Sequence, residues 1–137
     1  MPHLLYFAGD WRVLRRIDDR LSGRPGRFEG TARLAPDGEG LRYHEEGTLT
    51  LGDGPPLAAH RDYLWRPDEG GIAVLFPDGR PFHRFTPEGR APGTDHPCGR
   101  DLYRVTYDLS AWPGWTAEWT VTGPAKDYLM TTRYERP

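Results

Sequence analysis

The sequence predicts an all-β protein, an antiparallel up-and-down meander that closes into a barrel of about 8–10 strands. Turn-forming residues recur at short intervals, with 17 glycines and 14 prolines in 137 residues. The runs between these turns alternate apolar and polar residues, as strands with one buried face do. No long run has the spacing of an amphipathic helix, and only Leu4 to Phe7 suggests a short helical turn. The length suits one core, so we expect a single domain over residues 1–137.

Nine strands are expected, separated by turn segments such as Pro36-Asp37-Gly38, Pro77-Asp78-Gly79 and Gly123-Pro124. In chain order they are Trp11–Asp18, Arg27–Leu34, Leu41–Leu51, Leu57–Arg66, Ile72–Phe76, Pro81–Phe85, Asp101–Leu109, Thr116–Thr122 and Asp127–Tyr134.

Odd-numbered positions carry the apolar face in most of these strands. In the first half of the chain they are Trp11, Val13 and Ile17, then Leu41, Tyr43, Leu49 and Leu51, then Tyr63 and Trp65. In the second half they are Ile72, Val74 and Phe76, then Tyr103, Val105 and Tyr107, and finally Trp115, Ala117, Trp119 and Val121. The opposite faces carry Arg, Glu, His and Thr, which predicts a solvated exterior.

Three charged residues interrupt the inward face: Arg15, Glu45 and Arg61. A charge inside a barrel needs a partner or a ligand. One interpretation is that Glu45 and Arg61 simply pair across neighbouring strands. The other is that the interior is wide enough to admit water or a bound molecule.

A second constellation is formed by His83, His96, Cys98 and Asp101. Such a set is chemically competent to bind zinc or iron, or to activate a thiolate. It lacks a recognised ligand spacing, and Pro97 beside Cys98 favours a turn in which Cys98 is a small buried apolar residue. We therefore expect no metal and no cofactor; if a metal were bound, its ligands would be His83, His96 and Cys98.

The first expected strand opens with Gly9-Asp10-Trp11-Arg12-Val13-Leu14-Arg15-Arg16. This segment and the meander after it resemble the calycin superfamily, the lipocalins and their relatives. The resemblance implies that Trp11 closes the barrel floor and stacks on an arginine near the end of the chain, either Arg133 or Arg136.

Three further segments resemble an uncharacterised bacterial family of small lipocalin-like proteins. They are Phe76-Pro77-Asp78-Gly79-Arg80-Pro81-Phe82-His83, His96-Pro97-Cys98-Gly99-Arg100-Asp101-x-Tyr103 and Gly123-Pro124-x-Lys126-Asp127-Tyr128. This resemblance implies a lipocalin-like barrel and no established activity. The last histidine is His96, whereas haem-binding relatives place a ligating histidine later, so a haem site is not expected.

Composition excludes several partners. The net charge of −2 with no basic stripe argues against nucleic acid. No apolar run approaches a membrane span, and no leader segment is evident. One cysteine allows no internal disulfide, which favours a reducing cytoplasm. A homodimer remains compatible with the sequence.

The leading functional hypothesis is a binding barrel for a small aromatic or acidic ligand, most simply a carboxylate anchored by Arg61. Lys126, the only lysine in the chain, lies at the start of the last expected strand, one residue before Asp127, and adds positive charge. The expected ligand-binding residues are Arg15, Tyr43, Glu45, Arg61, Tyr63, Trp65, His83, Tyr103, Trp119 and Lys126.

Two alternatives stay open. One is a non-redox lyase, isomerase or cyclase in the same cavity, whose acid and base would come from Tyr43, Glu45, His83 and Asp101. The other is a protein-interaction module with a filled core. Fold alone does not separate a binder from an enzyme.

Overall fold

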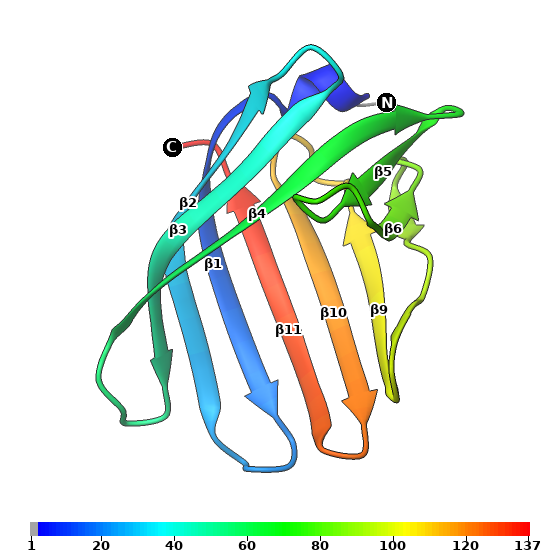
Figure 1. Cartoon of the computed structure of the whole chain (residues 1–137). Helices are drawn as coiled ribbons and strands as arrows, with labels where there is room; N and C mark the ends of the chain where they lie inside the picture. Colours follow the sequence, from blue (N-terminus) through cyan, green and yellow to red (C-terminus); the bar gives the residue numbers. More distant parts are fainter. Residues whose placement is uncertain (1–2) are drawn as a thin grey trace.

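The computed structural model describes residues 3–137 and confirms an all-β barrel (Figure 1). One antiparallel sheet of eleven strands has the order β6-β5-β4-β3-β2-β1-β11-β10-β9-β7, with β8 also paired to β9. The elements are the 3₁₀ helix η1 (Leu4–Phe7) and the strands β1 (Gly9–Asp19), β2 (Pro25–Pro36), β3 (Leu41–Leu51), β4 (Leu57–Asp68), β5 (Gly71–Leu75), β6 (Pro81–Phe85), β7 (Arg90–Pro92), β8 (His96–Cys98), β9 (Asp101–Asp108), β10 (Trp115–Gly123) and β11 (Lys126–Glu135). No helix among these residues is long and apolar enough to span a membrane.

All nine predicted strands are present, and their ends differ from the prediction by no more than two residues. The predicted turn at Leu4–Phe7 is confirmed as η1. The two short strands β7 and β8 were not predicted. Each contributes three residues and pairs only with β9, so neither is long enough to show an alternating pattern.

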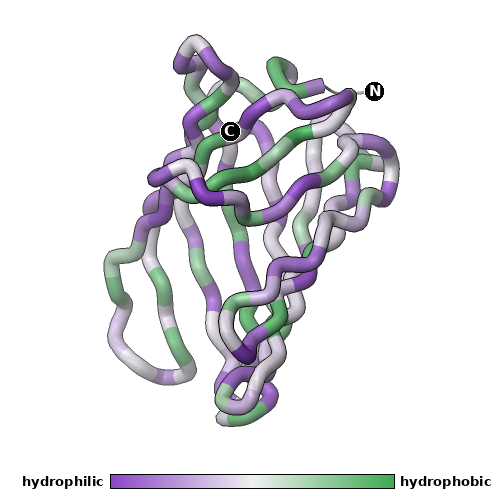
Figure 2. The backbone as a smooth tube through the Cα atoms, turned by 45° about the vertical axis from the view of Figure 1, so that its right-hand side comes forward, coloured by the Kyte–Doolittle hydropathy of each residue, from purple (hydrophilic) through white to green (hydrophobic). Residues whose placement is uncertain are grey.

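The predicted alternation holds through the middle of the strands and fails at some ends. Figure 2 shows hydrophobic and hydrophilic residues alternating along the tube. Val13, Leu41 and Val74 are buried as expected. Leu51, predicted to face inward, is 37% exposed, because it lies at the turn end of β3 where the ladder with β2 stops at Gly26.

Trp11 closes the end of the barrel that carries η1. Its side chain is fully buried, and its Nε1 donates to the carbonyl oxygen of Phe7 at 2.8 Å. The guanidinium of Arg136 lies 3.6 Å from the centre of the Trp11 ring, so the expected stacking arginine is Arg136. Arg133 instead lies outside, with a side chain that is 62% exposed and paired with Glu135. Aromatic rings fill this end of the barrel, which we call the floor: Phe7, Trp11, Trp65, Phe85, Trp112 and Trp115.

Replacing Trp11 by Ala should lower the free energy of unfolding by about 3–5 kcal/mol, because it leaves a cavity in the packed floor. Chemical denaturation measures this loss. The matched surface variant Arg133→Ala should stay within about 0.5 kcal/mol of the wild type. An unchanged denaturation midpoint for Trp11→Ala would show that the floor does not depend on this ring.

Candidate ligand-binding cavity

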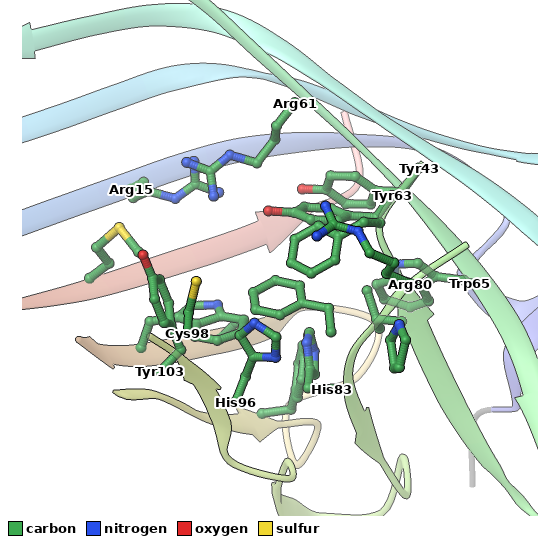
Figure 3. Close-up of a pocket in the computed structure, with 18 of the residues that line it drawn as sticks. Arg15, Tyr43, Arg61, Tyr63, Trp65, Arg80, His83, His96, Cys98 and Tyr103 are labelled. Carbon is green, nitrogen blue, oxygen red and sulfur yellow. The ribbon is translucent and has the colours of Figure 1, made fainter. Parts of the chain in front are cut away.

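Beyond the floor the barrel is hollow. Its cavity has a volume of about 800 Å³, and Figure 3 shows side chains converging on it from several strands. Of the ten predicted ligand-binding residues, the cavity is lined by Arg15, Tyr43, Arg61, Tyr63, Trp65, His83, Tyr103 and Trp119. The other two, Glu45 and Lys126, do not line it. Strands that alternate with a period of two bring one face to the interior, which puts these side chains at the cavity; their role in binding a ligand stays a prediction.

Glu45 lies behind the cavity wall as the carboxylate partner of Arg15. Arg15 Nη1 and Nη2 donate to Glu45 Oε2 and Oε1 at 2.9 and 2.7 Å, and Arg15 Nε donates to Thr132 Oγ1 at 2.8 Å. Arg15 and Glu45 are 6% and 1% exposed. This two-point geometry is the strongest arrangement available to a guanidinium and a carboxylate. Arg15 is therefore largely satisfied by the protein itself.

A directional chain of hydroxyl groups also ends on Glu45. Tyr43 Oη donates to Glu45 Oε1 at 2.6 Å, which uses the only proton of that hydroxyl. The contact of 2.8 Å between the hydroxyls of Tyr43 and Tyr134 must then use the proton of Tyr134. Glu45 thus receives two bonds from Arg15, one from Tyr43 and an ion pair from Arg61, which occupies all of its acceptor positions.

Arg61 differs from Arg15 because, in the part of the chain that the structure describes, only one of its nitrogens contacts a partner. Its Nε lies 3.3 Å from Glu45 Oε2, and its side chain is 42% exposed. Among residues 3–137 no hydrogen bond uses its terminal nitrogens. The sequence left open whether Glu45 pairs with Arg61; the structure shows that pair, but as the lesser partner beside Arg15. One carboxylate facing two guanidinium groups leaves one positive charge in excess.

The pKa values of Glu45 and of the two tyrosines beside it, Tyr43 and Tyr134, are shifted away from neutral pH. Burial alone would raise the pKa of Glu45, but the hydrogen bonds and charge of Arg15, with the charge of Arg61, hold it below its ordinary value. Burial raises the pKa of Tyr43, with the neighbouring Tyr134 and Glu45 adding to the effect. Burial and Glu45 together raise the pKa of Tyr134 to about 12. At neutral pH this network is one carboxylate, two guanidinium groups and two neutral phenols.

His83 lies on the wall opposite Arg15 and Arg61 (Figure 3) and is 6% exposed. Its Nε2 is 2.7 Å from the hydroxyl of Tyr107. Burial, with a smaller effect of the charge on His96, lowers the pKa of His83 to about 3. The imidazole is therefore neutral at any ordinary pH.

The expected turn around Cys98 requires correction. His96–Cys98 is a short strand, and Cys98 is exposed at the cavity wall rather than buried. The pairing of β8 with β9 explains this, because the tight hairpin turn between Cys98 and Asp101 leaves the thiol without a covering element. His83, His96 and Cys98 all line the cavity. Within residues 3–137, however, no group of three or more His, Cys, Asp and Glu side chains is placed to hold a metal ion.

Asp101 and Lys126 pair with each other instead of entering the cavity. Lys126 Nζ lies 3.2 Å from Asp101 Oδ2 and donates to the hydroxyl of Tyr103 at 3.2 Å. Asp101, predicted as a catalytic candidate, does not line the cavity. The lysine is linked to the cavity wall through Tyr103, which does line it.

Sequence reasoning missed Phe82, Tyr107 and Tyr134 as site residues of the cavity wall. It also missed Thr132 as a hydrogen-bond partner of Arg15. In a closed barrel the first and last strands pair, and the observed register sets Arg15 opposite Thr132 and Val13 opposite Tyr134. Pairing the first and last expected strands would therefore have placed Thr132 and Tyr134 beside the inward-facing residues of the first strand. Phe82 had no such signal, because a register shift at Val74 and Leu75 lets both Phe82 and its neighbour His83 line the cavity.

The family model of DUF6314, a family of unknown function, matches residues 7–136, and the chain belongs to this family. A comparison with curated proteins found no significant match.

Two solved structures are similar to the chain. The S-type phycobiliprotein lyase CPES from Guillardia theta matches with a TM-score of 0.62 and 11% identity, over 98% of this chain and 90% of that chain. At this identity the likeness shows a shared barrel fold. A redesigned β-barrel, mFAP1 bound to DFHBI, matches with a TM-score of 0.45 and 12% identity, over 97% of each chain.

The Glu45→Gln variant should lose about 3–5 kcal/mol of stability, because it leaves the buried Arg15 without a counter-charge. Urea denaturation at neutral pH measures the loss. Glu118→Gln, on an exposed position of β10, is the matched control and should be close to neutral. Equal stabilities for the two variants would contradict the assigned role of Glu45.

His83 should make the protein less stable in acid. Between pH 6.5 and about 3 the unfolded imidazole binds a proton that the folded one does not, so stability falls as the pH is lowered through this window. At pH 5 the loss is about 2 kcal/mol. The His83→Phe variant should show a flatter stability profile over this range, whereas the exposed-site control His60→Gln should follow the wild type. Parallel profiles for wild type and His83→Phe would contradict the assignment.

Proposed function

We propose that this protein binds a small molecule with an aromatic or alkyl body and a carboxylate group, held inside the barrel. The observation that carries the proposal is a cavity of about 800 Å³ that combines aromatic walls with the excess positive charge of Arg61. Ligand pockets are typically about 300–1,000 Å³, mostly apolar, with a few placed polar groups. A barrel with a filled core would leave no such space.

Arg61 is the group that supports an anionic ligand. Arg15 is occupied by Glu45 and Thr132, whereas the terminal nitrogens of Arg61 remain available next to the same carboxylate. A second anion would form charge-assisted hydrogen bonds with this partly buried guanidinium, and a carboxylate matches its planar geometry. Arg80 lies on the cavity wall as well, but its side chain is paired with Asp78.

The aromatic walls support a flat or hydrocarbon body for the ligand. The ring centroid of Phe82 lies 5.1 Å from that of Trp119 and 5.5 Å from that of Tyr63, and both pairs are stacked. All three rings line the cavity. Such surfaces bind by burial and offset stacking at little cost in side-chain entropy.

The acid–base alternative receives less support. A catalytic acid or base works best with a pKa near the working pH. The pKa of Glu45 is lowered, that of His83 is about 3, and that of Tyr43 is raised. These shifts fix charges in place, which suits binding better than proton transfer.

A thermal-shift screen tests the charge of the ligand. Biphenyl-4-carboxylate should raise the melting temperature more than its neutral carboxamide or a matched benzylic amine, because only the anion pairs with Arg61. A screen in which the neutral or cationic compound stabilises the protein most would overturn the proposal.

Arg61→Ala should weaken binding of the same carboxylate by about tenfold, the effect of one charge-assisted contact at a partly exposed site. Titration calorimetry measures the dissociation constants. Arg16→Ala is the control, because that arginine lies outside the barrel with a side chain that is 78% exposed. If the wild type binds the carboxylate and Arg61→Ala binds it equally well, Arg61 is not the anion site.

A further inference from the structure

One polar atom at the cavity wall lacks a partner. Among residues 3–137 two buried side-chain polar atoms make no hydrogen bond, His83 Nδ1 and Trp115 Nε1. Trp115 packs in the floor, whereas His83 lines the cavity. A buried polar group left without its hydrogen bond destabilises the folded state, and each such group in a native structure calls for an explanation.

The bond between His83 and Tyr107 indicates which ring nitrogen carries the proton. The Tyr107 hydroxyl has no other partner within residues 3–137. If Nε2–H donated to Tyr107, both the Tyr107 proton and the Nδ1 lone pair would be left without partners. If Tyr107 donates to Nε2, the only orphan is Nδ1–H, and the imidazole is neutral in either case. The second arrangement leaves fewer unpaired groups, so Nδ1 is a hydrogen-bond donor.

The donor atom, His83 Nδ1, lies well away from Arg61. Along β4, Arg61 and Trp65 are four residues apart, which spans about 13 Å of strand. Trp65 pairs with Val74, and Val74 pairs with His83. Figure 3 likewise shows Arg61 and His83 on opposite sides of the cavity.

We infer that His83 Nδ1–H is a second recognition point, which takes an uncharged oxygen acceptor, a carbonyl or ether, at the end of the ligand opposite its carboxylate. This inference rests on the proposed function and narrows it to elongated carboxylates with a distal oxygen. The rings of Phe82 and Trp119 stand edge-on to His83 at 4.7 and 5.0 Å and flank the approach. Nδ1 is shielded from solvent, so the proposal requires the ring of Phe82, which is half-buried, to shift when the ligand oxygen binds.

The test uses two biphenyl carboxylates that differ only in the para substituent of the distal ring, acetyl in one and isopropyl in the other. The two groups have similar shapes, but only acetyl accepts a hydrogen bond. The wild type should bind the acetyl compound about tenfold more tightly, as one net hydrogen bond allows. His83→Phe should bind both compounds equally.

Tyr107→Phe keeps the histidine and removes the hydroxyl that fixes its proton, so the acetyl preference should fall toward parity. Tyr6→Phe, at an exposed site, is the matched control and should keep the full preference. Long-range proton–nitrogen NMR correlation of the wild type reads the tautomer directly and needs no ligand. It should find the proton on Nδ1.

The outcomes distinguish failure of the inference about His83 from failure of the proposed function. A wild type that binds both carboxylates equally overturns the role of His83 and leaves the carboxylate site standing. A proton found on Nε2 also overturns it. If neither compound binds while the protein is folded, both proposals fail. If His83→Phe does not fold, Tyr107→Phe and the NMR measurement still decide.

Discussion

The buried ion pair between Arg15 and Glu45 is the constraint on which the rest of the interior depends. Removing two charges from water is costly, and the cost is recovered only when geometry and further hydrogen bonds are good. Here Thr132 on β11 and Tyr43 on β3 complete the pair, so three strands of the barrel are tied to one polar cluster. That cluster specifies how β1, β3 and β11 face one another across the interior.

The same cluster generates the chemistry of the cavity. Because the single negative charge of Glu45 faces the two guanidinium groups of Arg15 and Arg61, the interior keeps a positive charge despite the acidic chain. The floor of packed aromatic rings gives this site a rigid base: Trp115 stacks on Tyr134 with ring centroids 3.7 Å apart, and Tyr134 in turn bonds Tyr43. Packing at one end of the barrel thus supports the polar groups at the other.

The barrel wall is not closed by strand ladders all the way round. Most neighbouring strands share full ladders, but within residues 3–137 the hydrogen bonds between β6 and the segment before β8 are two, both of 2.9 Å and both between Arg84 and Thr94. Beside this seam the wall consists of side chains, with Phe82 packed edge-on against His96. Side chains hop between rotamers far faster than ladders open. In this sector, which carries His83, side chains rather than a strand ladder close the cavity wall.

The sequence by itself determined the strands, their approximate ends and the inward phase that places Arg15, Tyr43 and Trp119 at the interior. These features depend on local geometry, the period of two along a strand and the turn chemistry of Pro and Gly. Only the tertiary structure decided that Glu45 belongs first to Arg15, that Lys126 pairs with Asp101 outside the cavity and that Cys98 is exposed. The two ion pairs depend on which distant strands meet, and the exposure of Cys98 depends on a three-residue strand too short to leave a pattern. Alternation reports which way a side chain points; its partner depends on how the sheet closes.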